Sequence, residues 1–191
     1  MKKNLLTAIW FTLVTTILFG VLYPLAVTGL SQVLFHDRAN GQLLEANGKI
    51  IGSRIIGQAF TGSGYFHSRP SAAGTGYDPT SSGGSFLGPT NKTLVARVNV
   101  DVQRLQAENP GVPVPVDLVT SSASGLDPDI SPAAAEFQIP RVARERKISE
   151  TDLRGIVARH TEARQFGFLG EPRVNVLELN LELDSTHPAA R

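Results

Sequence analysis

The sequence predicts an α+β fold in which one N-terminal transmembrane helix is followed by a single mixed α+β soluble domain. Residues 4–35 carry no charged side chain, and an apolar run of this length is enough to cross a bilayer. The rest of the chain mixes stretches of helical spacing with short stretches of strand character. Its length is that of one ordinary domain. We therefore expect an anchor over residues 1–36 and a soluble α+β domain over residues 37–191.

The composition excludes several classes of protein. The 18 lysines and arginines balance 17 aspartates and glutamates, so the 191-residue chain has a formal net charge of +1. Nucleic-acid-binding domains carry a clustered basic excess, and this balance argues against a nucleic-acid partner. The chain has no cysteine, which excludes disulfide frameworks, cysteine-ligated zinc and thiol nucleophiles.

The N-terminal run has the features of a retained membrane anchor. Trp10 and Tyr23 lie near its two ends, and amphipathic rings favour the headgroup region. Pro24 would weaken a soluble helix but is tolerated in a membrane helix. A cleaved signal peptide is the alternative, but its apolar region is usually about 7–15 residues long. We expect a retained helix with Trp10, Tyr23 and Pro24 as membrane-anchor residues.

The distribution of charge around this run predicts its orientation. Lys2 and Lys3 precede it, whereas the first cations after it, Arg38 and Lys49, are farther away. The positive-inside rule therefore places the N-terminus in the cytoplasm and the soluble domain outside. For a bacterial protein, this means a single-pass protein of the inner membrane with a periplasmic domain.

The first part of the soluble domain is predicted to hold a β-hairpin and a long loop. Residues 42–51 form two apolar stretches around Asn47-Gly48, a pair that favours a type I′ turn, and Ile55 and Ile56 are expected to continue the second strand. Residues 61–91 contain seven glycines, six serines and three prolines among 31 positions. Aromatic and charged residues punctuate this loop, so we expect it to be ordered and packed rather than a flexible linker.

Helices are expected on either side of one short strand. Thr90 or Asn91 can cap a helix whose face is Leu94, Val98, Val102 and Leu105, and Pro110-Gly111 end it. The apolar residues 114–120 are expected to form a buried strand.

Two further helices and a final strand are expected after residue 130. Ser131-Pro132 begins a helix that Pro140 is expected to kink or divide, and Ser149 begins another, with Asp152 in the capping-box position. Residues 178–184 alternate strictly between polar and apolar types, which predicts a strand with a bulge near Leu177.

No motif assembles a catalytic centre in this sequence. Walker A and G-x-S-x-G patterns are absent, and the four histidines lack a second ligand at helical spacing, so neither catalytic residues nor a metal site is expected. The triplet Ser82-Gly83-Gly84 resembles a nucleotide-contacting loop, but turn chemistry explains it better. Asp127 and Asp129 could perform acid–base chemistry, bind a cation, or stabilise the helix that follows, and the last reading is preferred. The residues alone indicate a membrane-anchored accessory subunit; an independent periplasmic hydrolase lacks support.

A series of short segments along most of the chain forms a specific pattern. They are YFHSRPSA at 65–72, YDP at 77–79, LGPTN at 87–91, VPVDLVT at 114–120, SGLDP at 124–128, ISPAA at 130–134, RVA at 141–143, HTE at 160–162 and LGEPRVNVLELN at 169–180. Each segment is weak alone, but in their joint order they resemble the C subunit of the bacterial high-affinity potassium-transporting P-type ATPase, the KdpC family. The sequence departs from the usual pattern at Asp129, where the family has histidine, and at Ala123, where it has glycine.

The resemblance implies a non-catalytic subunit that stabilises an ATP-driven potassium importer and raises the ATP affinity of its ATPase subunit. The implied partners are a channel-like potassium-translocating subunit, the P-type ATPase subunit, a small single-helix subunit and membrane lipid. ATP and the potassium ion are implied for the complex, with no cofactor assigned to this chain. An outside domain cannot touch cytoplasmic ATP, so an effect on ATP affinity requires long-range coupling. The alternative is a cytoplasmic domain that contacts nucleotide directly, with Ser82 to Ser85 and Arg69 or Arg173 around the phosphates.

Ten residues are the candidates for contact with a partner or ligand. They are the aromatic, charged and amide side chains within the patterned segments. These candidates are Tyr65, Phe66, Arg69, Tyr77, Asp78, Asn91, Asp127, Glu162, Glu171 and Arg173.

Overall fold

The computed structural model describes residues 2–46 and 48–188. The chain divides into two compact units, Met1–Ile51 and Gly52–Arg191. Among the described residues they contain one helix that is apolar and long enough to cross a membrane, and a mixed domain of helices and short strands. This confirms the predicted α+β fold class.

The first unit begins with a continuous helical run, built from α1 (Lys2–Ile17), a π-helical turn (Leu18–Leu22) and α2 (Tyr23–Leu34). Its 33 residues are long and apolar enough to cross a membrane. Pro24 lies in the first turn of α2, and the preceding Tyr23 N–H bonds the Leu18 carbonyl five residues back. Proline lacks the N–H that would continue the regular ladder, so the π turn lies where the ladder is interrupted.

A short helix, α3 (His36–Ala39), and two strands, β1 (Leu43–Ala46) and β2 (Lys49–Ser53), complete this part of the chain. The two strands pair in a two-stranded sheet, which confirms the predicted hairpin. Gly48 has a φ of +72°, a left-handed value that glycine adopts without strain; Asn47 lies outside the described residues. The prediction that Ile55 and Ile56 continue the second strand is wrong. The strand ends at Ser53, and the chain turns so that Ile56 N–H donates to the Ser53 carbonyl.

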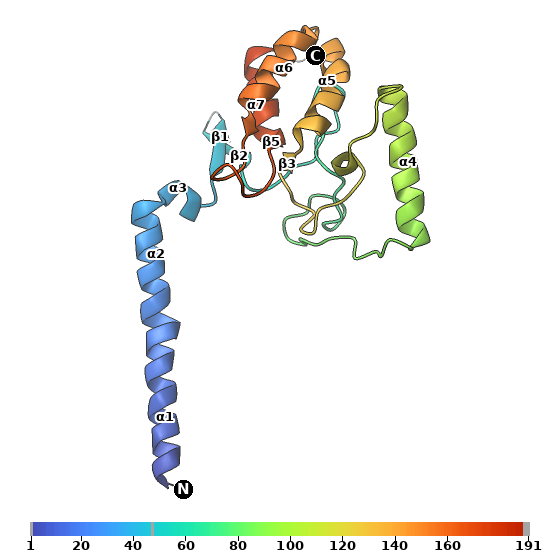
Figure 1. Ribbon diagram of the computed structural model, residues 1–191. Helices are drawn as coiled ribbons and strands as arrows, with labels where there is room; N and C mark the ends of the chain where they lie inside the picture. Colours follow the sequence, from blue (N-terminus) through green and yellow to red (C-terminus); the bar gives the residue numbers. More distant parts are fainter. Residues whose placement is uncertain (1, 47, 189–191) are drawn as a thin grey trace. The chain divides into compact units, whose positions relative to one another are not determined.

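The second unit contains a small sheet and four α-helices among its described residues. The sheet has the order β3-β5-β4, with β5 (Arg173–Asn175) antiparallel to both β3 (Asp129–Ile130) and β4 (Thr161–Glu162). Val174 pairs with Ile130 on one side and Thr161 on the other. Helices α5 (Pro132–Arg146), α6 (Glu150–Arg159) and α7 (Val176–Thr186) gather at one end, and α4 (Lys92–Glu108) stands beside them (Figure 1).

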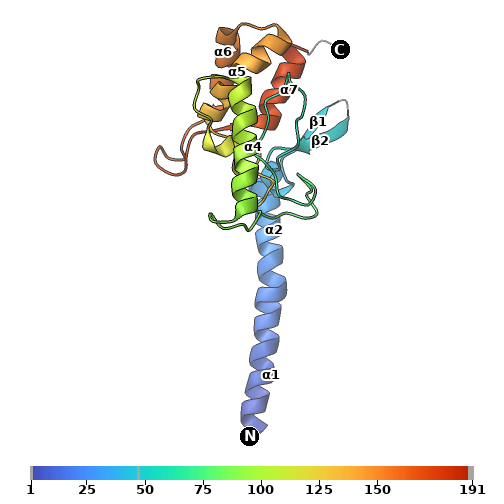
Figure 2. The ribbon, with the colours of Figure 1, turned by 90° about the vertical axis from the view of Figure 1, so that its right-hand side faces the viewer.

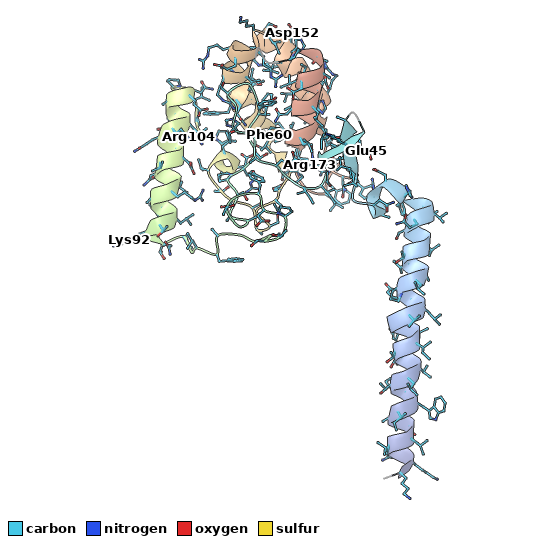
Figure 3. The ribbon with its side chains drawn as sticks, turned by 180° about the vertical axis from the view of Figure 1, so that it is seen from behind. Glu45, Phe60, Lys92, Arg104, Asp152 and Arg173 are labelled. Carbon is cyan, nitrogen blue, oxygen red and sulfur yellow. The ribbon has the colours of Figure 1, made fainter. Side chains whose placement is uncertain are left out.

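The core lies among α5, α6, α7 and the sheet. Leu105 of α4 joins it, and Val98 and Val102 pack against it, which confirms the predicted face of that helix. Phe60 also packs against the core, and its side chain lies in the interior of the domain in Figure 3. The largest wholly buried side chains are Phe66, Ile130, Ile139, Leu153, Leu179, Leu183, Val142, Val174, Val176 and Asn180.

Three helix starts follow the predicted capping chemistry. The Asn91 side chain accepts a hydrogen bond from Thr93 N–H at 2.8 Å, and Ser131 accepts one from Ala134 N–H at 3.0 Å. Ser149 accepts one from Asp152 N–H at 3.0 Å and donates its hydroxyl to the Asp152 carboxylate at 2.6 Å. These bonds satisfy amides that have no partner within the helix. Pro140 lies inside α5, which runs on past it, so the expectation that Pro140 divides the helix is wrong.

The strand predicted at residues 114–120 is wrong: Val116–Leu118 form a 3-10 turn. Pro113 and Pro115 lack the N–H donors that a central strand needs. Asp117 is buried and accepts hydrogen bonds from the Ser131 N–H at 2.7 Å and the Ser131 hydroxyl at 3.1 Å. The turn therefore supports the start of α5.

The final strand predicted at residues 178–184 is also wrong, because these residues belong to α7. Asn175 caps the helix by accepting from Glu178 N–H at 3.1 Å. Val176, Leu179, Asn180 and Leu183 then form one buried face at helical spacing. Strand β5 ends at Asn175, so the bulge expected near Leu177 does not exist.

Candidate functional site

The first part of the 61–91 loop is bound to the helices through its own backbone. Asn180 of α7 exchanges two hydrogen bonds with Phe66, and Gln138 of α5 exchanges two with His67. Each amide side chain thereby replaces a neighbouring strand for a segment that has none. Phe66 has 0% exposure and packs in the core, so among the ten candidates its side chain has a packing role inside the domain.

Two buried arginines of α5 hold the same segment. Arg141 donates to the carbonyls of Ser63 and Tyr65. Arg146 donates to the Gly64 carbonyl and to Asp184, and its guanidinium lies 4.7 Å from the centre of the Tyr65 ring. The Tyr65 hydroxyl donates to Asp184 at 3.1 Å. Tyr65 therefore closes a network between the loop, α5 and α7.

The middle of the loop folds on residues 120–127. The Ser71 hydroxyl donates to the Gly125 carbonyl at 2.6 Å and accepts from Tyr77 N–H at 2.8 Å. The Tyr77 hydroxyl donates to the Arg69 carbonyl, and burial raises the pKa of Tyr77.

Farther along, the loop is held by its own turns and by Ser124. Asp78 accepts from the Thr80 N–H and hydroxyl, which lower the pKa of its carboxyl. Ser82 and Gly83 both donate to the Ser124 carbonyl. The loop is therefore ordered and packed. The triplet Ser82-Gly83-Gly84, which resembles a nucleotide-contacting loop, belongs to a turn that is bonded within the domain to Ser124.

A groove beside the sheet brings together candidates from four separate segments. We call it the charged groove. It is lined by Arg69, Val116, Asp117, Asp127, Asp129, Ile130, Ser131, Glu171, Pro172 and Arg173. Arg69 comes from the loop, Asp127 from the approach to β3, Glu171 from the turn before β5, and Arg173 from β5 itself. Arg173 is labelled on the ribbon in Figure 3.

Oppositely charged side chains pair along this groove. Arg69 Nη1 lies 3.0 Å from Asp127 Oδ2, and Arg173 Nε lies 3.1 Å from Asp129 Oδ2. Arg173 also reaches Glu162 of β4 at 2.5 Å. Burial raises the pKa of Asp129, and the nearby Arg173 opposes that rise. Every arginine that lines the groove has a carboxylate partner. The groove therefore presents positive and negative side chains side by side.

The reading of Asp127 and Asp129 as stabilisers of the following helix is wrong. Ser131 caps α5, while Asp127 Oδ1 accepts from Asp129 N–H at 3.1 Å and Asp127 Oδ2 faces Arg69. Asp129 accepts a bond from Asn175 at 3.3 Å in addition to its pairing with Arg173. Within residues 2–46 and 48–188, no group of three or more histidine, aspartate or glutamate side chains is placed to hold a metal ion.

The ten candidates thus separate into three groups. Arg69, Asp127, Glu171 and Arg173 line the charged groove, and Glu162 joins them through Arg173. Tyr65, Phe66, Tyr77 and Asp78 hold the loop in place. Asn91 lies apart from both groups as the cap of α4.

Sequence reasoning missed the buried polar side chains that fix the loop and the groove. They are Asp117, Gln138, Arg141, Arg146 and Asn180. All except Asp117 lie on the buried faces that α5 and α7 have in the structure. A polar residue at a core position of a helix is the pattern that would have pointed to them, because buried polar groups need specific partners.

Comparison with known proteins agrees with the pattern of these segments. The family model described as "KdpC: K+-transporting ATPase, c chain" matches residues 5–185. The chain is 68% identical over 188 residues to the potassium-transporting ATPase KdpC subunit of Koribacter versatilis, covering 98% of this chain and 97% of that one. It is 56% identical to the KdpC subunit of Acidobacterium capsulatum, covering 97% of this chain and 100% of the relative. A family match over nearly the whole chain, supported by relatives of this similarity, means that the chain belongs to the KdpC family.

Proposed function

We propose that this chain is the non-catalytic accessory subunit of an ATP-driven potassium importer. Its relatives are named as subunits of a potassium-transporting ATPase, and the proposal extends that membership to a role. The subunit stabilises the assembly and raises the ATP affinity of the ATPase subunit. Its partners are the channel-like potassium-translocating subunit, the P-type ATPase subunit and the small single-helix subunit.

The charged groove is the observation that carries this proposal. It gathers exposed and half-buried charges of both signs from four segments on a rigid sheet and loop. A surface of this kind suits recognition of a polar protein surface, where charge pairs fix orientation and partner choice. The paired arginines have no free charge to offer a phosphate, and this favours a protein partner over a nucleotide.

The proposed placement has residues 1–36 as the anchor in the inner membrane and residues 37–191 as a domain on the periplasmic side. Trp10 and Tyr23 are the proposed aromatic anchor residues of this span, and Pro24 lies in the first turn of α2. Lys2 and Lys3 support a cytoplasmic N-terminus. With this orientation, the periplasmic domain cannot contact ATP. Its effect on ATP affinity is then long-range coupling through the membrane-embedded subunits.

Removing one exposed charge from the groove tests the proposed contact. Glu171 pairs with Arg164 at the surface, and exposed pairs contribute only about 0–1 kcal/mol to stability. We expect Glu171→Gln to lower co-purification of the channel-like and ATPase subunits with the tagged chain. Glu136→Gln is the control, because Glu136 is also an exposed glutamate paired with an arginine, Arg154, but does not line the groove. Equal assembly of both variants would show that the groove is not the contact.

The effect on ATP is measured separately from assembly. Purified complexes with and without this chain are compared for the ATP concentration that gives half-maximal ATPase activity. We expect this concentration to rise several-fold without the chain, since coupling free energies of about 1–3 kcal/mol correspond to 5–150-fold changes. An unchanged value in a fully assembled complex would contradict the chaperone role while leaving the assembly role intact.

The alternative is a cytoplasmic domain that binds nucleotide directly through Arg69, Arg173 and residues 82–85. It predicts that the full chain in detergent binds ATP and that Arg69→Ala abolishes the binding. It also predicts that a reporter active only outside the cytoplasm is inactive when fused after residue 191. An active reporter, together with protease access to the 61–91 loop in spheroplasts, would exclude this alternative.

A further inference from the structure

The turn between β4 and β5 exposes three large apolar side chains. Phe166 is 87% exposed, Phe168 70% and Leu169 47%. We call these three residues the apolar tip. The turn projects from the domain as a narrow hairpin, which is the brown loop at the left of the domain in Figure 2. Soluble proteins rarely gather such side chains at the end of a projecting loop unless they contact something.

The apolar tip is held in a defined conformation. Gln165 and Leu169 exchange backbone hydrogen bonds, each at 2.9 Å, and Gly167 N–H donates to the Arg164 carbonyl. Phe166 has a φ of +52° and Gly167 a φ of +80°. A left-handed phenylalanine costs conformational free energy, and this turn maintains that conformation while leaving the ring in solvent. The exposure is therefore built into the hairpin and does not result from a loose loop.

Charge is layered along this hairpin. Residues 165–170 carry no charged side chain. Arg164 and Glu171 form an ion pair at the base of the tip, and Arg173 of β5 pairs with Glu162 of β4 within the sheet itself. An apolar end above a charged base matches the change in polarity across the headgroup region of a bilayer, where aromatic and aliphatic side chains lie deeper than charged ones.

The connecting residues limit how far the second unit can move from the proposed membrane helix. The helix that is proposed to span the membrane ends at Leu34, and the second compact unit begins at Gly52. The intervening residues 35–51 reach at most about 60 Å when fully extended, and α3 and the β1–β2 hairpin shorten that reach. A tether of this length gives the tip a high effective concentration at the membrane, so a weak insertion suffices.

We propose that the apolar tip inserts into the boundary between headgroups and acyl chains of the bilayer that holds the N-terminal helix. Phe166, Phe168 and Leu169 enter the lipid, while the Arg164–Glu171 pair stays at the headgroups. This second attachment would limit the rotation of the domain about its tether. The inference rests on the proposed membrane anchor, and the experiment below separates the failure of one from the failure of the other.

The absence of cysteine allows a single fluorescent label to be placed at will. Phe168→Cys, labelled with an environment-sensitive NBD dye, is reconstituted as the full chain in vesicles of phosphatidylethanolamine and phosphatidylglycerol. Lipids that carry nitroxide quenchers at known depths then report contact with the bilayer. Leu13→Cys in α1 is the positive control for the anchor. Ser185→Cys, an exposed position near the end of α7, is the control for the domain surface.

We expect quenching by shallow nitroxides to be at least about twofold stronger at position 168 than at position 185, as an interfacial insertion requires. Adding Phe166→Asp to the labelled chain should reduce the quenching at 168, because a carboxylate opposes entry into lipid while aspartate tolerates a positive φ. Quenching at 13 together with equal, weak quenching at 168 and 185 would overturn the inference and leave the anchor in place. Weak quenching at 13 as well would overturn both. Protection of the label at 168 only after partner subunits are added, without lipid quenching, would identify a protein contact and also overturn it.

Discussion

Asn180 of α7 forms both backbone hydrogen bonds of Phe66. Its Oδ1 accepts from the Phe66 N–H at 2.9 Å, and its Nδ2 donates to the Phe66 carbonyl at 2.9 Å. Both residues are buried, with 1% and 0% exposure. One amide side chain thus forms the hydrogen bonds of two buried backbone groups, and it fixes the first part of the 61–91 loop to the helical core.

The first prediction concerns this pair. Asn180→Ala leaves the Phe66 N–H and carbonyl buried without partners, and each unsatisfied group costs about 1–3 kcal/mol. We expect a loss of about 2–4 kcal/mol in the free energy of unfolding, measured by urea unfolding of the full chain in detergent with circular dichroism. Asn99→Ala on the exposed side of α4 is the control. It should change stability by less than about 0.5 kcal/mol, and an equally small change at position 180 would contradict the assigned role.

Features set by neighbouring residues could be predicted from the sequence. The apolar helix, the hairpin and the caps at Asn91, Ser131 and Ser149 depend on residues within a few positions of one another. Each depends on local chemistry. A helix cap, for example, needs a side-chain oxygen two or three residues before a backbone amide that has no partner in the helix. The fold class could be predicted for the same reason.

The wrong secondary-structure predictions fall where tertiary packing decides whether a segment forms a strand or a helix. The leucines at 177, 179, 181 and 183 fit a strand by alternation, yet Asn175 caps a helix and Leu179 and Leu183 then lie on its buried face. The strand β5 ends where that cap begins. The apolar residues 114–120 gave a similar error, because the buried Asp117 has its partner in Ser131, 14 residues away. Sequence periodicity alone contains no information about such distant partners.

The candidate site could be predicted in part. Arg69, Asp127, Glu171 and Arg173 were chosen because they carry charge in patterned loops, and the fold brings them to one groove. The pairing of Arg173 with Asp129 depends on the antiparallel contact between β3 and β5, and that of Arg69 with Asp127 on the packing of the loop against residues 120–127; both are tertiary contacts between segments far apart in the sequence. The exposed apolar tip was likewise not singled out, since exposure is a property of the folded chain.

The second prediction concerns Arg146, whose side chain is wholly buried against Asp184 at 2.8 Å. Arg146→Lys keeps the charge, but its three donors lie on one nitrogen and cannot replace Nε, Nη1 and Nη2, which bond the Gly64 carbonyl, the His187 carbonyl and Asp184 separately. We expect a loss of about 2–4 kcal/mol in stability, in line with other broken buried pairs, measured by the same urea unfolding. Arg144→Lys on the exposed side of α5 is the control and should be nearly neutral. Equal effects at the two positions would contradict the network.

The third prediction concerns the dependence of stability on pH. Burial, with the nearby Arg141 as a second cause, lowers the pKa of His67 from its ordinary value of 6.5. The unfolded chain therefore takes up this proton at a higher pH than the folded chain. Stability from this group is present above about pH 6.5 and is lost as the pH falls through the folded pKa.

His67→Gln isolates this contribution. We expect the wild-type chain to lose more stability than His67→Gln between pH 7.5 and pH 5, measured by urea unfolding at each pH. The comparison of the two chains removes contributions that they share, among them that of Asp129, whose raised pKa acts in the opposite direction. Parallel pH profiles would mean that His67 titrates in the folded chain as it does in the unfolded chain.

The last prediction tests whether the 61–91 loop is fixed by close backbone packing. Gly125 has a φ of +66°, and a Cβ at this position would lie 2.6 Å from the Gly83 carbonyl oxygen and 2.7 Å from the Ala73 nitrogen. Both neighbours are backbone atoms and cannot move aside as a side chain would. We expect Gly125→Ala to cost about 2–4 kcal/mol through strain and overpacking, and to increase hydrogen–deuterium exchange at residues 71–86.

Gly88→Ala is the matched control, because a Cβ there meets no atom within 4 Å. It should leave exchange in the loop unchanged and stability the same or slightly higher, since alanine restricts the unfolded chain. The two substitutions add the same methyl group, so a difference between them reports the left-handed φ of Gly125 together with its contact with Ala73 and Gly83, and no general effect of removing glycine. If both variants exchange like the wild-type chain, residues 71–86 do not depend on this contact, and hydrogen bonds such as those of Ser71 and Ser82 hold the loop without it.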